Sequence, residues 1–174
     1  MKVDVIIPTY KPGKEFEELI CRLQKQTYPI HRIIIINTQT GVFPTELESE
    51  PYQIEIMHIK SEDFDHGGTR NMGASISHAD IVLYMTQDAV PADEHLIEKF
   101  ANVFEKHLEI GIAYGRQLPR EDCNIIERYT RRFNYPEKAG SNQKLICHSL
   151  ESKHFLLRCM CSLSKKLSFE CRRI

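Results

Sequence analysis

Four consecutive isoleucines, Ile33–Ile36, constrain the fold of this 174-residue chain more than any other feature of its sequence. Successive side chains of a β-strand point to opposite faces of the sheet, and β-branched residues pack well on both. An uninterrupted apolar run therefore predicts a strand buried on both faces, which is typical of parallel sheets covered by helices. We expect Arg32–Asn37 to be such a strand.

Around this run, short apolar segments alternate with segments whose apolar residues recur at helical spacing, as Phe16, Leu19 and Leu23 do. The resulting order βαββαβαβ predicts an α/β/α sandwich with a mostly parallel sheet and helices on both faces. The predicted strands are Val3–Ile7, Arg32–Asn37, Ile54–Ile59, Ile81–Met85 and Ile110–Tyr114, and the predicted helices are residues 14–26, a segment that begins near Gly68, Ala92–His107 and Glu121–Phe133.

Charge divides the chain into two parts. Residues 1–137 contain 15 lysines and arginines and 22 aspartates and glutamates, a net charge of −7, whereas residues 138–174 contain 8 and 2, a net charge of +6. We therefore predict one domain over residues 1–137 and a basic, cysteine-rich tail of uncertain structure over residues 138–174. Two explanations of the tail stay open: a frame-shifted end unrelated to the domain, and a basic extension that contacts a membrane surface.

The net charge of the whole chain, −1, gives no indication of binding to nucleic acid. The apolar N-terminal segment is interrupted by Asp4 and Pro8, so it is predicted to be neither a signal peptide nor a membrane span. We therefore expect a cytoplasmic location, with any membrane contact at the inner face of the membrane.

Polar residues follow three of the predicted strands: Thr9-Tyr10, Asn37-Thr38 and Gln87-Asp88. Ligands of parallel sheets bind beyond the carboxyl ends of the strands, so these groups are predicted to converge on a binding site. Two of these groups also have a simpler interpretation. Pro12-Gly13 after the first group can mark an ordinary strand-to-helix turn, and Asp88 can cap the next turn.

The segment DFDHGGTRNMGA, residues 63–74, is the strongest local motif. Gly67 and Gly68 permit close backbone approach at a helix start, where free N–H groups attract anions. Arg70 adds a planar cation suited to a carbonyl edge or a phosphate. The alternative is a helix start capped by Asp65 or Thr69, with Arg70 in solvent.

These motifs together resemble those of the inverting family 2 glycosyltransferases, enzymes with the GT-A fold. The matching segments are VDVIIPTYKPG, IIIIN, DHGGTRNMGA and LYMTQDA, over roughly residues 1–136. The form T-Q-D-A at the last strand end is similar to the rhamnosyltransferase-like branch that builds bacterial surface polysaccharide. The resemblance implies a Rossmann-like nucleotide-sugar-binding half that is truncated at its C-terminal side.

The resemblance also implies a set of site residues. Pro8, Thr9 and Tyr10 match the first-strand motif that contacts the nucleoside, and Asn37 stands where many members have an Asp that hydrogen-bonds a pyrimidine. Asp88 matches the carboxylate that binds Mg²⁺ or Mn²⁺. The implied nucleotide-sugar-binding set is Pro8, Thr9, Tyr10, Asn37, Gly68, Arg70, Gln87 and Asp88, with Asp88 as the metal ligand.

The implied reaction transfers a sugar, with rhamnose the one suggested, from a dTDP- or UDP-linked donor to a polysaccharide or glycolipid acceptor. A general base deprotonates the acceptor in this family, but Glu151 and Glu170 are the only acids after residue 137 and neither lies in a matching context. The catalytic base therefore stays unassigned. The alternative function is a catalytically silent remnant that binds a nucleotide sugar without transferring it.

Overall fold

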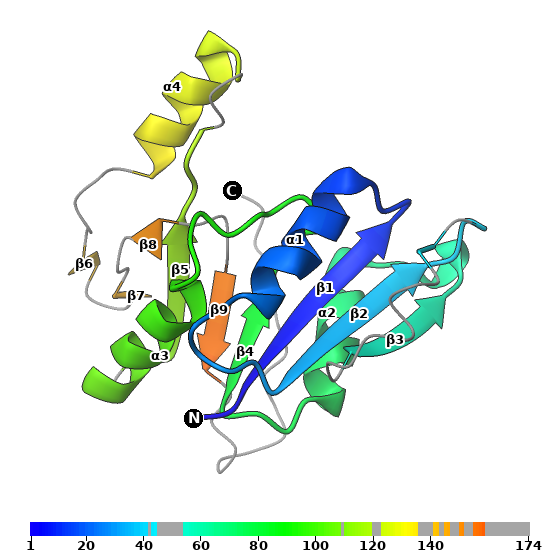
Figure 1. Ribbon diagram of the computed structural model, residues 1–174, viewed down its shortest axis with the longest axis horizontal. Helices are drawn as coiled ribbons and strands as arrows, with labels where there is room; N and C mark the ends of the chain where they lie inside the picture. The colour runs from blue at the N-terminus through cyan, green and yellow to red at the C-terminus, as the bar shows by residue number, and fades with distance from the viewer. Residues whose placement is uncertain are drawn as a thin grey trace.

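The computed structural model describes residues 1–41, 43–44, 54–108, 110–119 and 123–135, and it describes the backbone of four short strands between residues 141 and 158. A seven-stranded sheet in the order β3-β2-β1-β4-β9-β5-β8 forms its centre (Figure 1). The strands of this sheet are β1 Val3–Tyr10, β2 Arg32–Thr38, β3 Ile54–Ile59, β4 Ile81–Tyr84, β5 Ile112–Arg116, β8 Leu150–Glu151 and β9 Phe155–Arg158, and a separate pair consists of β6 Ser141–Asn142 and β7 Leu145–Ile146.

The isoleucine run forms the second strand from the β3 edge of the sheet, and it is buried on both faces, as predicted. Strand β2 pairs in parallel with β1 on one side and with β3 on the other. Ile34, Ile35 and Ile36 are fully buried and Ile33 is 3% exposed, so both faces of the strand are covered. The mostly parallel α/β/α sandwich and the order βαββαβαβ are therefore confirmed.

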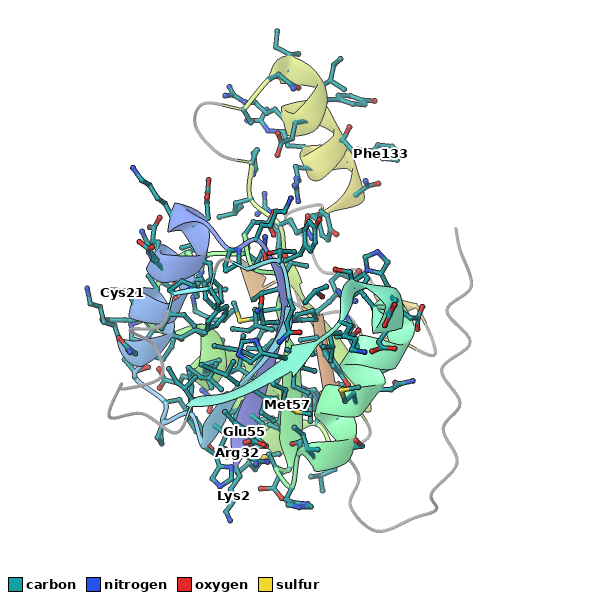
Figure 2. The ribbon with its side chains drawn as sticks, turned by 90° about the vertical axis from the view of Figure 1, so that its right-hand side faces the viewer. Lys2, Cys21, Arg32, Glu55, Met57 and Phe133 are labelled. Carbon is teal, nitrogen blue, oxygen red and sulfur yellow. The ribbon has the colours of Figure 1, made fainter. Side chains whose placement is uncertain are left out.

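Helices cover both faces of the sheet, and the edge-on view separates α1 from α2 clearly (Figure 2). Helices α1 Lys14–Gln24 and α3 Leu96–Lys106 pack in one hydrophobic cluster with the odd-numbered side chains of β1 and β2, such as Ile7 and Ile35. Helix α2 His66–Ile76 packs on the even-numbered ones, such as Ile6 and Ile36. A fourth helix, α4, spans Ile125–Asn134.

Helix α2 lies very close to the sheet because Gly73 has no side chain. A Cβ atom at Gly73 would lie 2.6 Å from Ile6 Cγ2 and 3.1 Å from Ile36 Cδ1, closer than packed atoms tolerate. The absence of a side chain at Gly73 therefore allows α2 to pack close to strands β1 and β2. The same close packing positions the N-terminus of α2 relative to the carboxyl edge of the sheet.

Helix α3 begins at Leu96, four residues later than predicted from Ala92. Residues 92–95 instead bond to the end of α1 and the turn after it. The Thr27 N–H donates to Glu94 O at 2.9 Å, and Gln26 Nε2 donates to Asp93 O at 3.0 Å. These tertiary hydrogen bonds satisfy backbone groups that a longer helix would have used itself.

At the opposite, amino end of the sheet, the buried carboxylate of Asp4 holds three segments together. Its Oδ1 lies 2.7 Å from His31 Nδ1, and its Oδ2 accepts hydrogen bonds from Ser77 Oγ at 2.7 Å and Arg32 at 3.1 Å. Burial by itself raises the pKa of Asp4, but hydrogen bonds from Ser77, His31 and Arg32 outweigh it and hold that pKa below its usual value. This cluster fastens β1 to β2 and to the segment before β4.

The C-terminal part of the chain contributes to the same sheet. Strand β9 lies between β4 and β5 and is antiparallel to both. Apart from the backbone of these short strands, residues 138–174 lie outside the described residues. The predicted boundary at residue 137 and the frame-shift hypothesis therefore stay predictions. No helix in the part of the chain that the structure describes is long and apolar enough to cross a membrane.

Candidate functional site

The carboxyl edge of the sheet carries a row of three side chains that the parallel register places side by side. Thr9 of β1 pairs with Asn37 of β2, and Asn37 pairs with His58 of β3. Thr9 Oγ1 donates to Asn37 Oδ1 at 3.1 Å, and Asn37 Nδ2 lies 3.1 Å from His58 Nδ1. We call Thr9, Asn37 and His58 the edge row.

Burial differs sharply along the edge row. Thr9 and Asn37 are 2% and 3% exposed, whereas His58 is exposed. Thr9 and Asn37, the two predicted contact residues, therefore use side-chain hydrogen-bonding groups within the protein. His58 is the member of the edge row that faces solvent. Sequence reasoning missed His58, because a lone histidine in a short strand has no motif and its neighbours become visible only through the strand register.

A second link joins the ends of β1 and β4. The Tyr10 N–H donates to Gln87 Oε1 at 2.7 Å, and Gln87 Nε2 donates to Tyr10 O at 3.0 Å. The Gln87 side chain thus completes a strand-like pairing after β4 has ended at Tyr84. Tyr10 is 51% exposed, and Lys11 Nζ lies 5.3 Å from the centroid of its ring.

Asp88 follows Gln87 directly, in a turn in which the Ala89 N–H donates to Thr86 O at 3.0 Å. Its side chain is exposed. Among the residues that the structure describes, no group of three or more His, Cys, Asp and Glu side chains is arranged to hold a metal ion. A single exposed carboxylate can serve in a metal site that substrate phosphates complete, and the magnesium or manganese role of Asp88 stays a prediction.

The capping alternative holds at the start of α2. Asp65 precedes the helix, and its carboxylate accepts a hydrogen bond from the Gly68 N–H. That N–H is therefore not free for an anion in this structure. A Cβ at Gly68 would lie 2.9 Å from the end of the Asp65 carboxylate, so a larger residue would require that carboxylate to shift. Arg70 is half-buried and donates to His66 O at 2.8 Å, within its own helix.

The predicted site residues come from both layers of the sandwich. Because side chains alternate along a strand, Thr9 and Asn37 point to the face of the sheet that α1 covers. Pro8 points to the opposite face, which α2 covers, and Arg70 is a residue of α2. Hydrogen bonds join Thr9 to Asn37 and Tyr10 to Gln87. A shared cleft that includes Arg70 and Asp88 stays a prediction.

This architecture matches solved structures of GT-A glycosyltransferases. A crystal structure of S. aureus TarS, residues 1–349, aligns with a TM-score of 0.66 at 16% identity, covering 91% of this chain and 47% of that one. Mannosyltransferase PcManGT from Pyrobaculum calidifontis, in complex with GDP-Man and Mn²⁺, aligns with a TM-score of 0.65 at 16% identity, covering 90% and 44%. The fold is therefore the GT-A fold.

The sequence defines the family within that fold. The model of glycosyl transferase family 2 matches residues 4–170, and the chain belongs to this family. It is 36% identical over 140 residues to the O-antigen chain rhamnosyltransferase RfbN of Salmonella typhimurium, and 34% identical over 133 residues to WbaN of Salmonella anatum. The family match extends beyond the predicted boundary at residue 137.

These relatives are longer than the chain described here. The RfbN alignment covers 80% of this chain and 44% of RfbN, and the WbaN alignment covers 75% and 42%. The chain thus spans less than half the length of the curated relatives that it matches.

Proposed function

We propose that the chain is the donor-binding part of a glycosyltransferase that moves a sugar from a nucleoside diphosphate to a growing surface polysaccharide or glycolipid. The observation that carries this proposal is the exposed Asp88, fixed at the carboxyl edge of the sheet by the Gln87–Tyr10 hydrogen bonds. The chain's 36% identity to the O-antigen chain rhamnosyltransferase RfbN supports rhamnose as the sugar. We propose a dTDP- or UDP-linked donor.

Each residue would have a distinct task in binding the donor. Asp88 would hold Mg²⁺ or Mn²⁺, which neutralises negative charge on the departing diphosphate when bound. Tyr10 presents an exposed ring to the nucleoside. Arg70, whose guanidinium carries several donors, would pair with a carbonyl edge or phosphate at the N-terminal side of α2.

A second candidate is a domain that binds the donor without transferring the sugar. The length of the chain relative to its relatives favours this candidate, because the alignments cover only 44% of RfbN and 42% of WbaN. Transfer also needs a base and an aligned acceptor, and general-base assistance alone typically contributes roughly a hundred- to ten-thousand-fold. Release of nucleoside diphosphate from dTDP-rhamnose, measured with and without glycan acceptors, separates the two candidates.

Calorimetry tests the donor site itself. We expect UDP or dTDP to bind with Mg²⁺ or Mn²⁺ present, and to bind at least tenfold more weakly in EDTA or after Asp88→Asn, because one carboxylate oxygen pair is lost from the metal. Asp80→Asn is the matched control, since Asp80 accepts from the Lys2 N–H at the opposite end of the sheet. Equal affinity of the wild type with metal and in EDTA would remove Asp88 from the metal role.

We also propose that the chain contacts the inner face of an anionic membrane through α4. Ile125, Ile126, Tyr129 and Phe133 are 69–87% exposed, and about 3.6 residues per turn places them on one side of the helix. Arg128 and Arg132 lie along one edge of this apolar side, a charge pattern suited to lipid phosphates. Helix α4 stands away from the sheet, with Phe133 on it (Figure 2).

The opposite side of α4 carries charged residues. Arg131 and Glu127 form an ion pair at 3.4 Å on the side of the helix opposite the exposed apolar residues, so α4 separates its charged side from its apolar side. Tyr129 and Phe133 stack with ring centroids 6.2 Å apart, which makes a continuous aromatic surface. A surface of this kind on a donor-binding domain would bring it to an acceptor carried in the membrane.

A further inference from the structure

We infer that His58 contacts the base of the donor nucleotide directly, and that Thr9 and Asn37 act by fixing the orientation and tautomer of its ring. This inference rests on the proposed function. It shifts the base contact from Asn37, the residue expected from the sequence, to a residue on the neighbouring strand.

The first step is the direction of the hydrogen bonds in the edge row. Thr9 Oγ1 donates to Asn37 Oδ1, which leaves the amide nitrogen of Asn37 turned toward His58. An amide NH₂ group can only donate, so His58 Nδ1 is the acceptor. A neutral imidazole with Nδ1 as acceptor carries its proton on Nε2. The row therefore specifies which nitrogen of His58 is a donor.

The second step is the fixed position of the ring. The His58 ring meets the edge of Phe43 with centroids 5.5 Å apart and planes at 86°, and Phe43 packs in turn on Phe16 with ring centroids 6.4 Å apart. Phe16 is fully embedded in the core. His58 is thus held by Asn37 on one side and by Phe43 on another, although it is exposed. A hydrogen-bond donor whose ring is held in this way loses little conformational freedom when it binds a ligand.

The third step is the distance from the metal-binding position. In the order β3-β2-β1-β4, His58 on β3 and Asp88 after β4 lie three strand spacings apart, about 14 Å. An extended nucleoside diphosphate has a comparable length. With its diphosphate at Asp88, a nucleotide that follows the carboxyl edge of the sheet brings its base to the end of β3. The Nε2–H of His58 suits a base carbonyl, such as those of uracil and thymine.

Two substitutions of one residue separate direct contact from support of Asn37. His58→Gln places an amide NH₂ near the position of Nε2 but removes the Nδ1 acceptor. His58→Asn places an oxygen near the position of Nδ1 but removes the outward donor. For UDP with Mg²⁺, calorimetry should give a loss of about tenfold for His58→Asn, the value of one neutral hydrogen bond, and less than about threefold for His58→Gln.

Ribose 5-diphosphate, which lacks the base, provides the ligand-side control. Its affinity should be the same for the wild type and both variants. Weak UDP binding by His58→Gln together with normal binding by His58→Asn would show that His58 acts only through Asn37 and would overturn the inference. Normal UDP binding by both variants, or equal losses for UDP and ribose 5-diphosphate, would also overturn it. A wild-type chain that binds no nucleoside diphosphate would overturn the proposed function itself.

Discussion

Gln87 and Tyr10 are joined by two hydrogen bonds that run from one side chain to both polar groups of one backbone residue, at 2.7 and 3.0 Å. The glutamine thereby replaces a strand residue where β4 has already ended. Because Asp88 is the next residue, the position of the proposed metal ligand depends on β1. Nucleoside contact and metal binding are therefore predicted to be coupled through this pair.

Replacing Gln87 tests that coupling. We expect Gln87→Ala to lower UDP affinity in Mg²⁺ by about tenfold, because the turn that carries Asp88 loses two hydrogen bonds to β1. In EDTA the loss should be much smaller. Gln39→Ala is the matched control, since Gln39 bonds to β3 and Ser61 through its backbone. Equal losses with and without metal would contradict the coupling.

Gly73→Ala should destabilise the protein by roughly 1–3 kcal/mol, the usual cost of overpacking, because the added Cβ would press on Ile6 and Ile36. Gly67→Ala in the same helix is the control. A Cβ at Gly67 would meet only the Asp65 carboxylate, at 3.6 Å, so its effect should be close to zero. Urea unfolding of both variants gives the comparison, and a stable Gly73→Ala protein would mean that α2 moves away without cost.

Acid should weaken the amino end of the sheet through Asp4. Its pKa is lower in the folded chain than in the unfolded chain, so its contribution is present above the unfolded value, about 3.9, and is lost as the pH falls through the folded value. Asp4→Asn should cost about 2 kcal/mol at pH 7. It should also flatten the dependence of unfolding free energy on pH below about 4. Parallel pH profiles for the two proteins would contradict this account.

Vesicle sedimentation tests the α4 surface. We expect the chain to bind vesicles that contain phosphatidylglycerol and to bind pure phosphatidylcholine much less, because arginines border the apolar side. Ile126→Ser with Phe133→Ser should abolish binding, since both side chains are more than 70% exposed. Thr130→Ser, on the same helix, is the control. If the double variant still binds vesicles, the α4 surface is not the membrane contact. If the wild type is a dimer and the double variant is a monomer, the surface binds a second copy of the chain instead.

The parts of the fold that depend on local pattern could be predicted from the sequence. Ile33–Ile36 specified a strand covered on both faces, and the helical spacing of α1 specified its buried side. The start of α3 could not be predicted in this way. It depends on hydrogen bonds from Gln26 and Thr27, which are about 70 residues away in sequence.

The candidate site shows the same division. The polar residues after β1, β2 and β4 could be placed together at the carboxyl edge from the sequence, because these strands are parallel; that this edge binds a ligand stays a prediction. The edge row could not be foreseen, since it requires the register that sets Asn37 beside both Thr9 and His58. Strand β9 was missed for a related reason: its four residues acquire their partners from β4 and β5, which precede it by many residues.

The insertion of β9 also determines when the sheet can be completed during synthesis. Strand β4 pairs with β1 on one side and with β9 on the other, and 70 residues, 85–154, separate Tyr84 from Phe155. At about 5–20 residues per second, the ribosome needs roughly 4–14 s to make this interval. Throughout it, the outer edge of β4 has no strand beside it and can pair with other chains. The four strands β3, β2, β1 and β4 are therefore complete seconds before β9 can cover their edge, and slow translation would lengthen that interval.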